Sequence, residues 1–286
     1  MTWEETIKYI RTQPEYAYLV EKAYLDEHLE LNVKRYMNEE EWKETHAYVK
    51  KYAPAGKNIL DVGSGNGISA IAFALSGYHV TVLEPDKSDT VGCGAIKKLK
   101  HHYQLTNIQI IEAFAENASL QDSTFDIVYC RQSMHHANNL KTFVKNITTS
   151  LKPGGIFFSV RDHVVYNKKD KEWFLQSHPL QKFYEGENAY SSKEYQNAIQ
   201  KAGLSLIKEL KHFESIINYF PLTHKEFLEK RSNWEGFIRN AAKKIPFASS
   251  KLLYPLFKGI YLLKNGNVYN EKLVPGRMYS YIALKK

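Results

Sequence analysis

Cysteine is scarce in this chain of 286 residues, where only Cys93 and Cys130 occur. Two cysteines make no disulfide framework, so we expect both to lie in or beside an apolar core. The sequence also lacks any run of 18 apolar residues, which argues against a membrane-spanning helix. Its first residues have neither the basic nor the apolar region of a signal peptide. We therefore expect a cytoplasmic protein.

Acidic residues are few toward the C-terminus. Residues 221–286 contain thirteen Lys and Arg against four Asp and Glu, whereas the rest of the chain is close to neutral. The overall composition, with 43% hydrophobic and 24% charged residues, is that of an ordinary globular protein. The net charge of +8 is thus a local property of the C-terminal part, and it bears on the choice of partners there.

Apolar runs and helical patterns alternate through the middle of the chain. Strands are expected near 58–62, 79–83, 108–112, 125–130 and 155–160, with helices near 67–76, 88–102 and 139–150. Such alternation predicts an α/β fold with a doubly wound, mainly parallel, Rossmann-like sheet. Two further strands, at 204–212 and 278–284, are expected to form an antiparallel hairpin at the sheet edge.

The segment from Asp61 to Gly67 is the most informative part of the sequence. An apolar strand ends in Asp61-Val62-Gly63-Ser64-Gly65-Asn66-Gly67, and helical composition follows directly. Glycines at such a turn allow a tight bend and a close approach by a ligand. Glu84 ends the next strand, 21 residues after Gly63, where an acid can accept hydrogen bonds from ribose hydroxyls. This pattern predicts a site for an adenosine-type cofactor.

The glycine spacing distinguishes this loop from a dinucleotide-binding one. The loop reads G-x-G-x-G, and Ile68 occupies the last glycine position of a dinucleotide fingerprint. Three further motifs follow at residues 123–129, 133–136 (Ser-Met-His-His) and 151–155 (Leu-Lys-Pro-Gly-Gly). They resemble, in this order, the fourth strand, the His-His segment and the Pro-Gly-Gly turn of the class I S-adenosyl-L-methionine (SAM)-dependent methyltransferases. The chain is most similar to the branch with ubiquinone- and menaquinone-biosynthesis enzymes and many small-molecule methyltransferases.

The resemblance implies a SAM site at the carboxyl ends of the strands. Glu84 would bind the ribose, and Asp61 would organise the loop or reach the methionine amino group through water. Phe114 replaces an acid that the family often has after the third strand, so Phe114 would pack on the adenine while the Ala115 N–H makes the polar contact. Arg131 either faces the methionine carboxylate or forms a structural salt bridge. The predicted cofactor-binding residues are Asp61, Gly63, Ser64, Gly65, Asn66, Gly67, Glu84, Pro85, Phe114, Ala115, Glu116 and Arg131.

Candidate catalytic residues follow the fourth and fifth strands. Asp162 and His163 lie on the acceptor side, where Asp162 could polarise His163 as a general base. His135 and His136 are the alternative pair, with packing or helix capping as their other explanation. No metal is expected, because neighbouring histidines cannot easily share one ion and no acid–histidine cluster is evident beside them.

The sequence predicts methyl transfer to a small or lipid-linked acceptor, with O-methylation favoured. Alternatives are an NAD(P)-dependent oxidoreductase and a non-catalytic SAM-binding module. The fourth strand ends in Cys130-Arg131-Gln132-Ser133, without the Asn/Asp-Pro-Pro-Tyr segment typical of amino-group methylation in bases or glutamine. No nucleic-acid partner is therefore expected.

The chain divides into five predicted parts. They are an N-terminal helical cap (1–52), the SAM-binding core (53–165), a cap and edge strand (166–213), a basic helical insertion (214–275) and a final strand (276–286). Within the insertion, lysines alternate with aliphatic and aromatic residues over 243–264. This segment is either a helical hairpin that covers the sheet edge or a contact with an anionic membrane surface, which would make the protein peripheral to a membrane.

Overall fold

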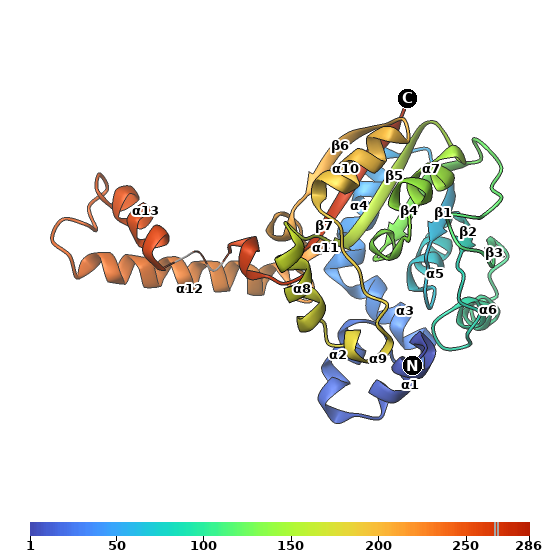
Figure 1. Cartoon of the computed structure of the whole chain (residues 1–286), viewed down its shortest axis with the longest axis horizontal. Helices are drawn as coiled ribbons and strands as arrows, with labels where there is room; N and C mark the ends of the chain where they lie inside the picture. Colours follow the sequence, from blue (N-terminus) through green and yellow to red (C-terminus); the bar gives the residue numbers. More distant parts are fainter. Residues whose placement is uncertain (266, 268) are drawn as a thin grey trace.

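A seven-stranded sheet runs through the body of the protein in the order β3-β2-β1-β4-β5-β7-β6. The structure is a computed structural model, and it describes all residues except 266 and 268, which fall in the predicted insertion (Figure 1). Neighbouring strands from β3 to β5 are parallel, and β7 is antiparallel to both β5 and β6. The strands are β1 (Asn58–Val62), β2 (His79–Leu83), β3 (Ile108–Ile111), β4 (Phe125–Arg131), β5 (Leu151–His163), β6 (Leu204–Leu210) and β7 (Met278–Lys285). The predicted fold class is confirmed.

Helices cover both faces of the sheet. One face packs against α3 (Leu29–Asn38), α4 (Glu40–Tyr52), α5 (Ile68–Leu75), α6 (Cys93–His102) and α11 (Ile216–Tyr219), and the other against α7 (Leu140–Thr149) and α10 (Ser192–Lys201). Side chains alternate between the two faces along each strand, as the pleat requires. In β4, Tyr129 belongs to the first core and Val128 to the second. Parallel strands buried on both faces account for the apolar runs in the sequence.

Aromatic side chains from two distant segments meet over the carboxyl ends of the strands. The first segment contains α1 (Trp3–Arg11) and α2 (Ala17–Lys22), and the second contains α8 (Lys168–Ser177) and α9 (Gln181–Tyr184). Trp3 lies 4.8 Å from Tyr184 between ring centroids, and Tyr9 lies 5.3 Å from Phe183. These contacts join α1 and α9 into one cover, with Leu180 buried beneath it. We call the two segments, residues 1–25 and 166–190, the cap.

Two helices of the insertion project away from the body as an arm (Figure 1). They are α12 (His224–Lys243) and α13 (Tyr254–Asn265), and the base of α12 is anchored by the packing of Phe227 against Tyr219 and Phe213. The arm extends outward from the body (Figure 1), so these two helices do not form the predicted hairpin that covers the sheet edge. No helix in the described part of the chain is both long enough and apolar enough to cross a membrane.

Candidate functional site

The glycine loop between β1 and α5 is shaped by close contacts. Gly63, Gly65 and Gly67 have φ angles of 66°, 55° and 85°, a region that favours glycine. A Cβ on Gly63 would lie 2.4 Å from the Cβ of Ser133, whose hydroxyl donates to the Val62 carbonyl at 2.9 Å. The loop after β4 is thus fitted directly against the glycine loop.

Space is open above the middle glycine. A Cβ on Gly65 would meet nothing nearer than the Val91 carbonyl oxygen at 3.9 Å. Beside it, Asn66 donates from its side-chain amide to the Tyr24 carbonyl at 2.7 Å, and the Ser64 hydroxyl donates to the Asp61 carbonyl at 3.0 Å. The cap is therefore tied to the loop that it covers, while the backbone at Gly65 is left open to a ligand.

Asp61 presents an unsatisfied carboxylate oxygen at the end of β1. Its side chain is fully buried, and Oδ2 accepts a hydrogen bond from the Ser69 hydroxyl at 2.7 Å. Oδ1 has no hydrogen-bond partner among the described residues. Burial raises the pKa of Asp61 to about 6. A buried orphan acceptor needs a donor, and the ammonium group of a methionine moiety is a donor of the right charge.

Glu84 accepts a hydrogen bond from the backbone of the glycine loop. Its Oε2 accepts from the Gly65 N–H at 2.7 Å and its Oε1 from the Asp86 N–H at 2.9 Å. A carboxylate has about four lone-pair positions, so each oxygen can still accept one ribose hydroxyl. Burial raises the pKa of Glu84 to about 7. The donor and acceptor set of Asp61, Glu84 and the glycine loop thus fits SAM, with half-buried Pro85 continuing the chain beyond Glu84.

The predicted adenine-side residues lie after β3. Phe114 is 59% exposed, so its ring is available to a ligand, and Ala115 beside it is buried. The Ala115 carbonyl accepts from the Asn146 side chain at 2.6 Å. Glu116 accepts from the Asn138 N–H at 3.0 Å, which joins this turn to the loop after β4. The adenine contacts themselves stay predictions.

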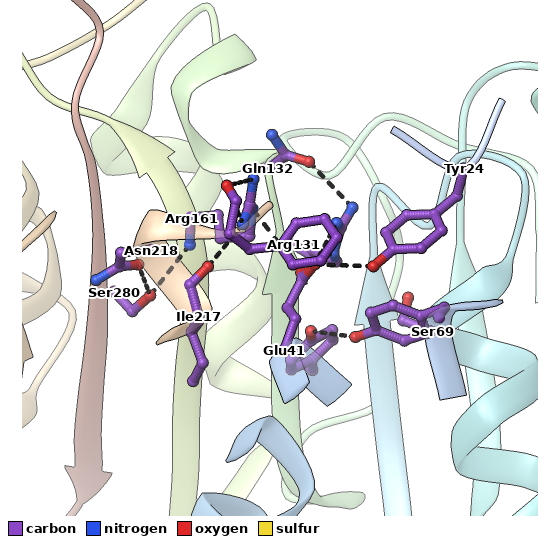
Figure 2. Close-up of polar contacts among 12 residues, drawn as sticks. Tyr24, Glu41, Ser69, Arg131, Gln132, Arg161, Ile217, Asn218 and Ser280 are labelled. Carbon is purple, nitrogen blue, oxygen red and sulfur yellow. Dashed lines mark hydrogen bonds and ion pairs between the residues drawn. The ribbon is translucent and has the colours of Figure 1, made fainter. Parts of the chain in front are cut away.

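Arg131 makes a bidentate ion pair with Glu41 of α4 (Figure 2). Its Nε and Nη2 donate to the two Glu41 oxygens at 2.7 and 3.2 Å, and the guanidinium also lies over the rings of Tyr24 and Tyr36. Burial acts to raise the pKa of Glu41, but Arg131 and Arg161 outweigh burial and lower it. Two roles were predicted for Arg131, and the structure contains one of them, the salt bridge.

Asp162 pairs with His135 and not with His163, so the predicted partner was wrong. Asp162 Oδ1 accepts from the backbone N–H of His135 and lies 3.0 Å from His135 Nδ1. His163 instead places Nδ1 2.6 Å from the Gly276 carbonyl oxygen, which fixes the ring proton on Nδ1. Burial lowers the pKa of both rings, that of His163 to about 3. Both imidazoles are therefore neutral near pH 7 and expose an unprotonated Nε2.

The sequence analysis missed Glu187, which lies in the cap. Its Oε2 is 3.7 Å from His135 Nε2, and its Oε1 accepts from the Tyr184 hydroxyl at 2.5 Å. The expectation that no acid–histidine cluster lies beside His135 was thus wrong. His136 is exposed and lies outside the cluster, with Nδ1 3.0 Å from the Gly186 carbonyl oxygen. No local motif could have identified Glu187, because it is distant in the sequence from His135 and His163, the two histidines of the cluster.

Comparisons with known proteins identify the family to which the chain is similar. The family model described as a methyltransferase domain matches residues 33–209. The ubiquinone biosynthesis O-methyltransferase of Acinetobacter baumannii (strain ACICU) is 31% identical, with 61% of this chain and 72% of that enzyme covered. The enzyme of the same name from Rickettsia prowazekii (strain Madrid E) is 34% identical, but only 34% of this chain and 37% of that enzyme are covered.

Solved structures show the same fold at low sequence identity. The structure of Haemonchus contortus phosphoethanolamine N-methyltransferase 2 in complex with S-adenosyl-L-methionine has a TM-score of 0.51 and 19% identity. The match covers 85% of this chain and 52% of that one. This likeness concerns the architecture alone.

Proposed function

Because this chain belongs to the SAM-dependent methyltransferase family, we propose that it methylates an oxygen atom of a small or lipid-linked acceptor. The observation that carries the proposal is the cluster of buried His135, Asp162 and His163 with Glu187, whose side chain is 6% exposed, in the turn that packs against the glycine loop and beside it. An oxygen nucleophile must lose its proton, and a cluster of unprotonated nitrogens and a carboxylate is suited to that task. The relatives named for O-methylation in ubiquinone biosynthesis support the same reaction type.

The bound cofactor supplies a methyl group that is already activated by its sulfonium centre. The glycine loop and Glu84 would hold the ribose side, and Asp61 Oδ1 would accept from the amino group. Ser133, which packs on Gly63, places His135 two residues farther along the same turn. The chain's main contribution is to hold the acceptor oxygen in line near the histidine cluster and to exclude water.

The cap would complete the acceptor pocket. Glu187 belongs to the cap, whereas His135 lies in the turn after β4 and His163 at the end of β5, so the cluster is assembled only when the cap is closed. Asn66 and His135, which contact Tyr24 and Glu187 of the cap, are both buried, as is Glu84. We infer that entry of cofactor and acceptor requires part of residues 1–25 or 166–190 to move, and that closure brings Glu187 to the acceptor.

The arm supports a second proposal, that the enzyme works at an anionic membrane surface. Large apolar side chains on or near α13 are strongly exposed, including Phe247 (79%), Leu252 (87%) and Leu263 (90%). Residues 243–264 contain five lysines and no acidic residue, although Lys258 pairs with Glu235 at 2.8 Å. Exposed apolar groups between cations are typical of segments that lie in a membrane interface.

Liposome sedimentation tests the arm. The protein should sediment with vesicles that contain phosphatidylglycerol but not with neutral phosphatidylcholine vesicles, and high salt should weaken binding. The double variant Leu252→Ser with Leu263→Ser should lose this binding, whereas Ile207→Ser, an exposed apolar residue of β6, should keep it. Failure of the wild-type protein to sediment at low salt would refute the membrane role.

The acceptor reaction is tested by release of S-adenosylhomocysteine (SAH) across a panel of phenols, other hydroxylated metabolites and lipid-linked phenols. Turnover with hydroxyl acceptors, and none with matched amines, is the expected result. Turnover confined to amines would overturn the O-methylation proposal. Dependence on SAM and not on NAD would also exclude the oxidoreductase alternative.

A further inference from the structure

We propose that His135, His163 and Glu187 form a binding site for a divalent transition metal, with Zn²⁺ as the best-matched ion. Each residue offers one ligand atom, and the three atoms lie within 4.8 Å of one another. They come from three separate segments: the turn after β4, the end of β5 and the cap. The proposal rests on the proposed function, because it names how the same cluster would activate the acceptor oxygen.

The ligand atoms are free and converge. The ring protons of His135 and His163 lie on Nδ1, so each Nε2 carries a lone pair. Glu187 Oε2 is buried and has no hydrogen-bond partner within the part of the chain that the structure describes. Three electron-pair donors that face one another in a buried space repel, and a cation at their centre removes that repulsion.

Each ligand also has the kind of outer partner that metal sites use. The carboxylate of Asp162 orients His135, the Gly276 carbonyl orients His163, and the Tyr184 hydroxyl donates to the other oxygen of Glu187. Such partners fix the tautomer of a ligating histidine and the rotation of a ligating carboxylate. The outer partners bind the Nδ1 atoms of both histidines and Oε1 of Glu187, so the two Nε2 atoms and Oε2 keep their lone pairs for an ion, within the part of the chain that the structure describes.

Two histidines and one carboxylate are a ligand set that zinc uses in catalytic sites, where a fourth position stays open. Zinc bonds of about 2.0–2.2 Å place tetrahedral ligand atoms roughly 3.4 Å apart. The 3.7 Å between His135 Nε2 and Glu187 Oε2 is close to that spacing, and His163 lies within 4.8 Å of both, so binding of the ion would draw the three ligand atoms closer together. His178 Nε2 lies 3.7 Å from Glu187 Oε1 and helps to hold the carboxylate.

The open position would take the acceptor hydroxyl. A hydroxyl coordinated there would lose its proton at a lower pH than a free one, because the cation stabilises the remaining negative charge, and the proton would pass to solvent before the cap closes. His135 would then act as a ligand, and the ion, in place of an imidazole base, would promote loss of the proton from the hydroxyl. Since Glu187 lies in the cap, the ion would also fasten the cap to the sheet.

Metal binding can be measured without any acceptor. Full-length protein treated with EDTA and dialysed should bind one Zn²⁺ per chain by calorimetry, and Zn²⁺ should raise the melting temperature. Co²⁺ should give the visible absorption of a four-coordinate site. Glu187→Gln keeps the shape of the side chain but removes its charge, and we expect Zn²⁺ affinity to fall at least tenfold. His163→Ala should do the same, while His101→Ala, an exposed histidine of α6, should bind as wild type.

SAH binding serves as the folding control, because Glu187→Gln leaves the glycine loop intact. Absence of Zn²⁺ and Co²⁺ binding by wild type, or unchanged affinity in both Glu187→Gln and His163→Ala, would overturn the metal site. Full methyl transfer by metal-free enzyme would also overturn it, yet would leave O-methylation standing. Stoichiometric Zn²⁺ binding without methyl transfer to any hydroxyl would support the site and refute the proposed function.

Discussion

Asp162 Oδ1 lies 3.0 Å from both the backbone nitrogen and the ring Nδ1 of His135. One carboxylate oxygen therefore fixes both the turn after β4 and the orientation of the imidazole that it carries. The Ser159 hydroxyl donates to the other oxygen of Asp162, so the acid cannot rotate freely. Burial raises the pKa of Asp162 to about 6, which leaves it ionised at neutral pH.

Replacing Asp162 with Asn should lower kcat far more than SAH affinity. An amide at this position no longer selects the Nδ1–H tautomer of His135, so Nε2 would not be held with a free lone pair. Loss of acid–base function typically costs about 10²–10⁴-fold in rate. Steady-state kinetics with the acceptor identified by the SAH screen, together with SAH calorimetry, checks this. Full activity would show that Asp162 only supports the turn.

Gly65→Val should abolish SAH binding. A side chain at Gly65 would extend into the open space above the loop, where the cofactor is proposed to lie. Gly77→Val is the matched control, because Gly77 also has a positive φ, 87°, and has no atom near its Cβ position. Both variants should lose similar stability, but only Gly65→Val should lose SAH in calorimetry. Equal SAH affinity in the two variants would show that the site is elsewhere.

SAH affinity should rise as the pH is raised through about 7. Burial, followed by the charges of Asp86 and Asp61, raises the pKa of Glu84 to about 7, so Glu84 gains its charge over this range. An ionised carboxylate accepts stronger hydrogen bonds from ribose hydroxyls than a neutral carboxyl does. Calorimetry at pH 6 and 8 should reveal the change.

Glu84→Gln provides the control for this pH dependence. The variant should bind SAH roughly tenfold more weakly or worse at pH 8, since charge-assisted hydrogen bonds contribute about 1.5–3 kcal/mol each. The rise in affinity centred near pH 7 should be absent from this variant, which leaves only the smaller change from Asp61, whose pKa is about 6. A wild-type pH profile that persists in Glu84→Gln would assign the titration to another group.

Glu41→Gln should destabilise the protein by about 3–5 kcal/mol, because it leaves the guanidinium of Arg131, whose side chain is only 12% exposed, without its counter-charge. Glu112→Gln breaks an exposed pair with Lys97 and should cost only about 0–1 kcal/mol. Urea denaturation of both variants gives the comparison. Equal losses in the two would mean that Arg131 keeps its charge satisfied by water or by another partner.

Local signals in the sequence predicted the strands and the glycine loop well. Apolar runs and turn residues mark β1, β2 and β4 to within a residue or two, because those elements are set by pattern and turn chemistry. The expected strand at 155–160 was too short. In the structure β5 begins at Leu151 and passes through Pro153 and Gly154 with a register irregularity against β4.

The polar partners could not be predicted, because they depend on contacts between distant segments. Glu41 and Arg131 are separated by 90 residues, and Glu187 reaches His135 from the cap. The position of the arm could not be predicted from the sequence either. An apolar pattern in α13 shows which side chains avoid water, but it does not show whether a sheet edge or another surface covers them.

The most direct test of the central claim is an NMR spectrum of the product formed from SAM labelled with ¹³C in its methyl group. With the acceptor found by the SAH screen, the account predicts that the label appears as an O-methyl carbon, in amounts equal to the SAH released. Glu187→Gln should form little of this product while still binding SAH. The account would be contradicted if the label appeared on a nitrogen or carbon atom and the Glu187→Gln variant formed as much product as the wild-type protein.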